Sequence, residues 1–333
     1  MDIRNARASA RFWRRLLQAG FLILTLSVGI RFGLFVGEAA AGAPIVWQRP
    51  PAVEGFLPIG ALVSLKDWLL SGRFDRIHPA ALALLLTFAG ISLIAKKGFC
   101  SWLCPVGTLS DALAAAGRRL FGRNVLPPGW LDIPLRVLKY LGLAFFVKLI
   151  VIDMPAAALG GFLNSPYWAS ADVRMLYFFT RPSTVTLVVL AILVALSLAV
   201  RGAWCRYLCP YGALLGLISF LSPLKIHRNP ELCTGCGACR RACPSRLPVD
   251  ERTVVRSPEC TGCLTCTDHC PQQGALGIAL PGRSRRHWPG WAFAALVLLL
   301  FLAGVGTGMA TGHWQGALGT GAYRWLIPLA GGR

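Results

Sequence analysis

The chain has 333 residues, of which 55% are hydrophobic, and a mean hydropathy of +0.57. This is too apolar for an ordinary soluble domain, because several runs reach or approach the about 17 to 25 residues that cross a bilayer. The net charge is +20, but no nucleic-acid-binding fold accompanies it, so membrane topology and attraction to anionic lipid are the expected causes of the charge.

Five apolar segments predict an all-α membrane protein of about five transmembrane helices. They are residues 16–36, 79–95, 140–152, 184–200 and 291–309. If the chain alternates across the membrane from a cytoplasmic N-terminus, 24 of the 34 Lys and Arg fall on the inner side. That is the positive-inside pattern of multi-pass proteins.

Two segments on either side of residue 45 could change this count of spans. An Arg-rich start, an apolar stretch and the letters E-A-A-A-G-A-P are typical of a signal peptide, although the stretch is long enough for a retained anchor, which we favour. Residues 56–70 carry Lys66 and Asp67, whose charges each cost roughly 2.5–3.5 kcal/mol at mid-membrane. This segment is therefore predicted to be an interfacial or re-entrant helix.

Two related motifs follow the second and fourth predicted spans. The first elbow, residues 99–105, reads F-C-S-W-L-C-P, and the second elbow, residues 204–210, reads W-C-R-Y-L-C-P. Proline fits the first position of a helix, so the second cysteine of each elbow is a predicted N-cap, where the helix dipole favours a thiolate. The elbows' cysteines are Cys100, Cys104, Cys205 and Cys209. Helices are predicted over 105–121 and 210–221.

The repeat indicates an internal duplication that can bring the four elbow thiols to one point. Four interpretations of them stay open. They hold a third iron–sulfur cluster, they form redox-active or transiently metal-binding thiol pairs, they ligate another cofactor, or they pack as small apolar side chains. The repeated C-x3-C-P spacing makes simple packing unattractive.

Residues 225–281 are polar and rich in Cys, Gly and Pro, and they contain the run C-x2-C-x2-C-x3-C-P twice. This spacing is typical of bacterial ferredoxins, in which each [4Fe–4S] cluster takes three cysteines of one run and the last cysteine of the other. One cluster is assigned to Cys233, Cys236, Cys239 and Cys270. The other is assigned to Cys260, Cys263, Cys266 and Cys243. Structural zinc sites are the alternative, but they usually pair two C-x2-C arms across a longer gap.

Three regions follow from these segments. Residues 1–224 form a membrane domain with the duplicated span and elbow, residues 225–281 a cytoplasmic 2[4Fe–4S] ferredoxin module, and residues 282–333 a fifth transmembrane helix with an outer tail. All 12 cysteines fall in segments assigned to the inner side, whereas structural disulfides belong outside. The thiols are therefore expected to be ligands rather than disulfide partners.

Charged residues near the outer boundary offer a second kind of site. Arg31 and Lys148, with Asp153, are candidates for a quinone head-group site, because charge inside a membrane usually has a function. Both cations are also close enough to the boundary to reach the head groups. His78 precedes a proline at the start of a span, where capping or a turn is a better explanation than metal ligation.

Together, the motifs resemble the polyferredoxin-type 4Fe–4S membrane proteins. That family includes the quinol dehydrogenase membrane subunit of periplasmic nitrate reductase systems, and its core is shared by the membrane regulator of nitrous oxide respiration and by a cytochrome oxidase assembly factor credited with copper reduction. The resemblance covers residues 60–281, with all 12 cysteines in register. It implies a bacterial inner-membrane protein whose N-terminus and clusters are cytoplasmic.

The expected function is electron transfer between the quinone pool and a respiratory or assembly partner, with quinone or quinol as substrate. A quinol dehydrogenase component is thus the expected kind of enzyme, and no catalytic residue is assigned. The alternatives are a metal (copper) reductase or cofactor-assembly protein that acts through the elbow cysteines, and a redox sensor that signals by the oxidation state of its clusters.

Overall fold

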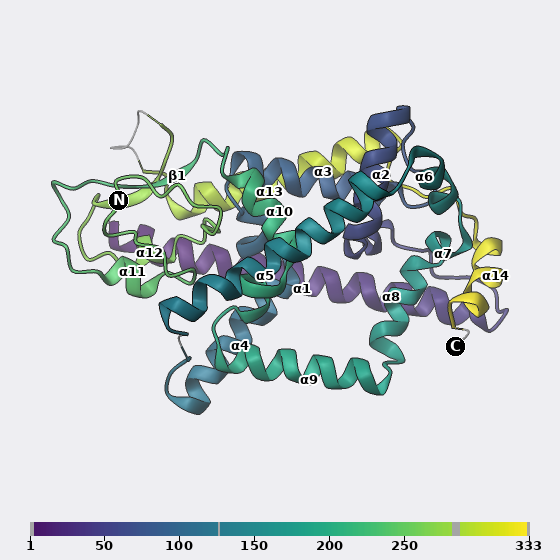
Figure 1. Cartoon of the computed structure of the whole chain (residues 1–333), viewed down its shortest axis with the longest axis horizontal. Helices are drawn as coiled ribbons and strands as arrows, with labels where there is room; N and C mark the ends of the chain where they lie inside the picture. Colours follow the sequence, from purple (N-terminus) through teal and green to yellow (C-terminus); the bar gives the residue numbers. More distant parts are fainter. Residues whose placement is uncertain (1–2, 126, 282–286, 332–333) are drawn as a thin grey trace. The chain divides into compact units, whose positions relative to one another are not determined.

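The structure is a computed structural model that describes residues 3–125, 127–281 and 287–331 (Figure 1). The chain forms two compact units. Unit 1 comprises Met1–Leu22, Phe88–Leu143 and Leu193–Phe301, and unit 2 comprises Ile23–Thr87, Ala144–Ile192 and Leu302–Arg333. The chain thus passes from one unit to the other five times, and each passage falls within one of the predicted spans.

Five helices carry those spans. They are α1 (Ile3–Ala40), α3 (Pro79–Ile94), α5 (Gly129–Val147), α9 (Thr184–Ala199) and α13 (Gly290–Ala310). Among the described residues, two helical segments, Ala10–Ala40 and Gly290–Ala310, are long and apolar enough to cross a membrane, and there are up to four spans if each of two bent helix pairs counts as one. The fold is therefore that of a mostly helical membrane protein, and the span count of five stays a prediction.

Helix α5 begins at Gly129, 11 residues before the predicted span at 140–152. Charged residues made this stretch a poor membrane segment by sequence, but Asp132 and Lys139 are 4% and 0% exposed. Asp132 accepts hydrogen bonds from the second elbow, and Lys139 forms an ion pair with Glu259. Because these charges are neutralised inside the protein, the helix extends well past its apolar part.

The elbows of unit 1 are short π-helical turns, Phe99–Leu103 and Trp204–Leu208, each followed by an α-helix. Helix α4 spans Pro105–Phe121, as predicted, and α10 spans Pro210–Ser219. The end of α10 falls two residues before the predicted one. Beyond Ser219 the chain tightens into 3-10-type turns, because the N–H groups of Phe220, Leu221 and Ser222 donate to carbonyl oxygens three residues earlier.

The polar segment of unit 1 is closed by a two-stranded antiparallel sheet. Strand β1 (Lys225–Arg228) pairs with β2 (Leu276–Ala279), with Ile226 opposite Ile278. Both isoleucines are buried. Between the strands lie the short helices α11 (Ala238–Ala242) and α12 (Thr265–Asp268), which are neighbours close to β1 (Figure 1). The sheet therefore joins the beginning and the end of the cysteine-rich segment.

Unit 2 contains shorter helices. They are a 3-10 turn at Pro51–Phe56, α2 (Pro58–Ser71), a π-helical turn at Lys148–Asp153, α6 (Ala156–Leu163), α7 (Pro166–Ala169), α8 (Ala171–Thr180) and α14 (Thr320–Gly331). Helix α2 corresponds to the interfacial helix predicted over 56–70. Its Lys66 Nζ donates to the carbonyl oxygens of Ile150 and Val151, both at 3.0 Å, which satisfies the cation without an acidic partner.

A buried ionic network holds unit 2 together. Arg49 donates to Glu54 at 2.7 Å and to Asp172 at 2.8 Å, and both carboxylates are fully buried. Tyr323 OH also donates to Asp172, at 2.9 Å. His78 Nε2 donates to the Trp168 carbonyl oxygen at 2.9 Å. The sequence predicted a capping or turn role for His78, whereas its side chain lies in a buried network that connects segments far apart in the chain.

Candidate functional site

The four elbow cysteines come together in unit 1. The thiol of Cys205 lies close enough to interact electrostatically with those of Cys100, Cys104 and Cys209, and the thiols of Cys100 and Cys104 also interact with Cys209. All four side chains are only partly exposed. The two elbows therefore form a single four-thiol centre, as the duplication suggested.

The two elbows have the same backbone geometry. The N–H of Cys104 donates to the Phe99 carbonyl oxygen at 2.9 Å, and the N–H of Cys209 donates to that of Trp204 at 3.0 Å. Each cysteine then adopts extended backbone and caps the helix that starts at the following proline. At the second elbow, the Gly212 N–H donates to Cys209 Sγ at 3.2 Å. The predicted N-cap positions are confirmed.

A glycine three residues after the second cysteine completes each elbow, and this residue was missed in the sequence. A Cβ on Gly107 would lie 2.3 Å from the carbonyl oxygen of Cys100, closer than real atoms come. A Cβ on Gly212 would lie 3.6 Å from Cys209 Sγ, which is ordinary contact. The signal was available, because the full repeat is C-x-x-L-C-P-x-G.

Burial dominates the acidity of the elbow thiols. It raises the pKa of Cys100 to about 12 and that of Cys104 to about 11, and it also raises the pKa values of Cys205 and Cys209. The positive charge of Lys97 acts in the opposite direction on three of the four. A reactive thiol requires a lowered pKa, whereas metal coordination replaces the thiol proton outright. The environment thus suits ligands better than free redox thiols.

A buried ionic group lies beside this centre. Lys139 Nζ is 2.5 Å from Glu259 Oε2, and Tyr140 OH donates to the other carboxylate oxygen at 2.7 Å. Burial raises the pKa of Glu259, but the charges of Lys97 and Lys139 and the two hydrogen bonds outweigh it and leave this pKa below its usual value. Glu259 is therefore an anion, next in sequence to Cys260.

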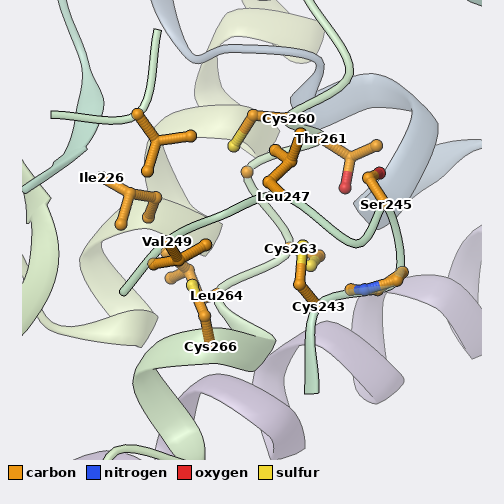
Figure 2. A pocket seen from close by; sticks show the side chains of 13 residues that line it. Ile226, Cys243, Ser245, Leu247, Val249, Cys260, Thr261, Cys263, Leu264 and Cys266 are labelled. Atoms are coloured by element: carbon orange, nitrogen blue, oxygen red, sulfur yellow. The ribbon is translucent and has the colours of Figure 1, made fainter. Parts of the chain in front are cut away.

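Four cysteines of the two ferredoxin-type runs line a pocket. Figure 2 shows them around the space, among apolar side chains that include Ile226, Leu247 and Val249. Those cysteines are Cys243, Cys260, Cys263 and Cys266. This is the set assigned by sequence to one cluster, including Cys243, which belongs to the other run and follows α11. Burial raises the pKa of Cys243 to about 11.

The remaining four cysteines are less closely gathered. Cys239 and Cys270 interact electrostatically, and Cys239 is buried. Cys236 is exposed, and Cys233 is partly exposed. The N–H of Gly235 and the side chain of Arg228 lower the pKa of Cys233. Both contacts act in favour of the thiolate form of Cys233.

Left-handed backbone recurs at matching positions of the two runs. Gly235 and Gly262 have φ of 70° and 63°, and two residues later Gly237 and Leu264 have φ of 65° and 56°. Leucine rarely adopts this conformation, so the loop geometry overrides local preference there. Such turns point successive N–H groups into a concavity, which is a common arrangement for an anionic Fe–S group.

Hydrogen bonds fasten both elbows to the segments that line the pocket. Ser101 Oγ donates to the Thr261 carbonyl oxygen at 2.7 Å, and Trp102 Nε1 donates to that of Gly262 at 3.1 Å. From the second elbow, Arg206 donates to the Pro244 carbonyl oxygen at 2.8 Å. The four-thiol centre and the pocket are therefore direct neighbours.

The N-terminal part of α1 supports the same region. Arg14 donates to the Cys263 carbonyl oxygen at 3.3 Å and to Asp111 of α4 at 3.0 Å. Gln18 Nε2 donates to the Ser101 carbonyl oxygen at 3.0 Å. From the sequence, Arg14 counts only as one of the cations that set the topology. In the structure, its side chain also positions the loop that carries Cys263.

The residues considered for a quinone head-group site have other contacts. Lys148 Nζ is 2.6 Å from Asp153 in an exposed ion pair. The guanidinium of Arg31 lies over the ring of Trp47, 6.0 Å from its centroid. Each cation thus has its own local partner.

Within residues 3–125, 127–281 and 287–331, no three His, Cys, Asp or Glu side chains lie close enough together to hold a single metal ion. A [4Fe–4S] cubane is larger than one ion and spaces its four thiolates around a core. A pocket with four cysteines on its walls, left-handed turns and buried cations nearby fits such a group in donor type and number.

Comparisons with known proteins agree with this arrangement. The 4Fe-4S binding domain family matches twice, over residues 77–124 and 182–229, and the 4Fe-4S dicluster domain family matches residues 225–272. Each of the first two matches contains one elbow, at the two places where the sequence predicted an internal duplication. No solved structure is significantly similar to the chain.

The relatives are electron-transport and ferredoxin-type proteins. The chain is 46% identical to the putative electron transport protein YccM of Escherichia coli, over 99% of this chain and 92% of that one. It is 27% identical to the ferredoxin-type protein NapH of E. coli, over 73% and 79%, respectively. It is 28% identical to the protein NirI of Paracoccus denitrificans, over 70% of this chain and 36% of that one.

Replacement of the elbow glycines tests the close approach at the first elbow. Gly107→Ala should destabilise the protein by about 1–3 kcal/mol, because its methyl group meets a backbone carbonyl that cannot move cheaply. Gly212→Ala, at the matching position of the second elbow, should be tolerated. The thermal unfolding midpoint of each variant in detergent measures this, and equal midpoints would show that the first elbow is not tightly packed.

Proposed function

Because the chain belongs to the polyferredoxin-type family of membrane iron–sulfur electron-transport proteins, we propose that it relays electrons between the quinone pool and a respiratory partner. One observation carries the proposal, namely the four-thiol centre that lies directly beside the four-cysteine pocket. Electron transfer needs closely spaced centres, and the elbow side chains donate to the very loops that line the pocket.

The chemistry requires one-electron carriers in sufficient number. Oxidation of a quinol to a quinone releases two electrons and two protons, and iron–sulfur clusters accept electrons singly, so two clusters take up the electrons of one quinol. The chain's own part is to provide ligands, to compensate their charge and to keep water away. The eight cysteines of the two ferredoxin-type runs are the proposed ligands, with the assignment made from sequence.

The elbows are proposed to hold a third iron–sulfur cluster. Four convergent thiols provide the required ligand number, and burial raises their pKa values, which disfavours the interpretation as reactive thiols. The match of both elbow segments to a 4Fe-4S binding domain supports the same assignment. The elbows follow α3 and α9, whose apolar surfaces offer a lipid-soluble quinol a route to this centre.

The proposed topology has five spans, with the N-terminus and the cysteine-rich region on the cytoplasmic side of a bacterial inner membrane. All 12 cysteines and 24 of the 34 Lys and Arg belong to unit 1, and the remaining cations belong to unit 2. This asymmetry is what the positive-inside rule expects if the five passages between the units are membrane crossings.

The topology can be tested with reporters that are active on one side only. Fusions after Pro281 and after Arg333 should report opposite faces of the membrane, because one span separates the two positions. The same face at both positions would remove the fifth span from the proposal.

Iron and sulfide analysis tests the third cluster. Anaerobically prepared protein should contain about 12 Fe with three clusters and about 8 Fe with two, at four irons each. The double variant Cys100→Ser and Cys205→Ser should lose one cluster's worth of both elements. Ser197→Ala and Ser219→Ala, at two buried serines outside the elbows and combined as a control, should lose none. Unchanged iron in the cysteine variant would reject the elbow cluster.

Reduction by quinol tests the proposed function itself. Wild-type protein in liposomes should show bleaching of cluster absorbance when quinol is added without oxygen. Cys104→Ser and Cys209→Ser should each slow this reaction, while dithionite still reduces the clusters of the ferredoxin-type runs, whose ligands are untouched.

Equal rates of cluster reduction by quinol in the wild type and both variants would show that the elbows do not lie on the electron path. If no quinol reduces intact clusters, the relay is contradicted and a metal reductase is favoured. In that case, copper ion should reoxidise clusters that dithionite has reduced.

A further inference from the structure

Lys96, the residue two positions after the end of α3, is buried in an unusual state. Its side chain is 0% exposed, and among the described residues its Nζ has no hydrogen-bond partner. An ammonium group without a partner in the protein interior is costly, so buried lysines are normally paired or neutral. The buried ammonium group of Lys96 therefore requires a nearby anion to stabilise it.

The backbone of Lys96 is held in a conformation that lysine rarely adopts. Its φ is 57°, in the left-handed region. Its N–H donates to Ser222 Oγ at 3.1 Å, which fixes the turn. In the turn before the second elbow, the left-handed residue is Gly202, one position nearer to its elbow cysteine, and Arg201 stands at the position of Lys96. Glycine adopts this conformation without strain, whereas a lysine is strained in it, and such strain is found most often at functional sites.

The side chain lies against the cysteine run that lines the pocket. A Cβ on Gly262, within the loop of Cys260 and Cys263, would be 3.3 Å from the Lys96 Cβ. The Lys96 side chain is thus packed against the loop that carries two of the pocket's cysteines, Cys260 and Cys263.

We propose that Lys96 is the buried counter-ion of the iron–sulfur cluster held by Cys243, Cys260, Cys263 and Cys266, and that it raises the reduction potential of that cluster relative to its neighbours. The inference rests on the proposed function, because it requires a cluster in this pocket. It adds a positioning residue that sets where an electron resides.

The physical reason is charge compensation. A cubane with four thiolates is anionic, and its negative charge increases by one when it accepts an electron. A fixed ammonium in a medium of low dielectric constant therefore stabilises the reduced form more than the oxidised form. Water screens the exposed cations of the same region, so a buried lysine acts more strongly than they do.

The test is a redox titration of the purified full-length protein, followed by electron paramagnetic resonance and accompanied by iron analysis. Lys96→Met removes the charge and keeps much of the volume, and Lys96→Arg keeps the charge. Lys225→Met is the matched control, because Lys225 also interacts with Cys260 but is partly exposed and donates to the carbonyl oxygens of Phe220 and Ser222.

In Lys96→Met, we expect one cluster to become at least tenfold harder to reduce, a shift of about 59 mV for one electron. The potentials of the other clusters in this variant should shift less. All cluster potentials in Lys96→Arg and Lys225→Met should also shift less. Loss of one cluster's iron in Lys96→Met but not in Lys96→Arg would also support the counter-ion role.

The inference would be overturned if Lys96→Met kept the wild-type iron content and its cluster potentials were no lower than those of Lys225→Met. Equal iron loss in Lys96→Met and Lys96→Arg would overturn it too. Wild-type protein without any [4Fe–4S] signal would instead contradict the proposed function, which keeps the two failures distinct.

Discussion

One buried carboxylate connects the parts of the cysteine-bearing unit. Asp132 of α5 is 4% exposed and accepts hydrogen bonds from Arg206 at 2.7 Å and from Tyr207 at 2.6 Å, both in the second elbow. Arg136 also donates to it and reaches the Ser245 carbonyl oxygen, while Arg206 reaches that of Pro244. Removing one partner of such a buried group costs about 3–5 kcal/mol, so the place of the elbow relative to Cys243 depends on this contact.

The surroundings of the thiols follow a common electrostatic rule. Iron–sulfur clusters are anionic, and the protein places Lys96, Lys97 and Lys139 where the exposed fraction is 3% or less. Among the residues that the structure describes, Lys139 alone of these three forms a direct ion pair with a carboxylate, that of Glu259. The excess of buried positive charge is unfavourable in the bare polypeptide, and it becomes favourable once negative clusters occupy the region. Cofactor binding and stability are thereby coupled.

Sequence reasoning succeeded where a local pattern has a local cause. The apolar runs gave α3, α9 and α13 to within a residue or two, and proline after cysteine gave both N-caps. It failed where distant partners change the cost of a residue. The span predicted at 140–152 left out the first half of α5, where Asp132 and Lys139 have partners 74 and 120 residues away.

The sequence by itself determined the membrane class, the two ferredoxin-type runs and the duplicated elbow, because fixed spacings and apolar periodicity are properties of neighbouring residues. Only the tertiary structure decided that the two elbows meet, that they adjoin the pocket of the second run, and that Lys96 is buried without a partner. Those facts depend on contacts between segments a hundred or more residues apart, and no local pattern encodes which charges such packing removes from water.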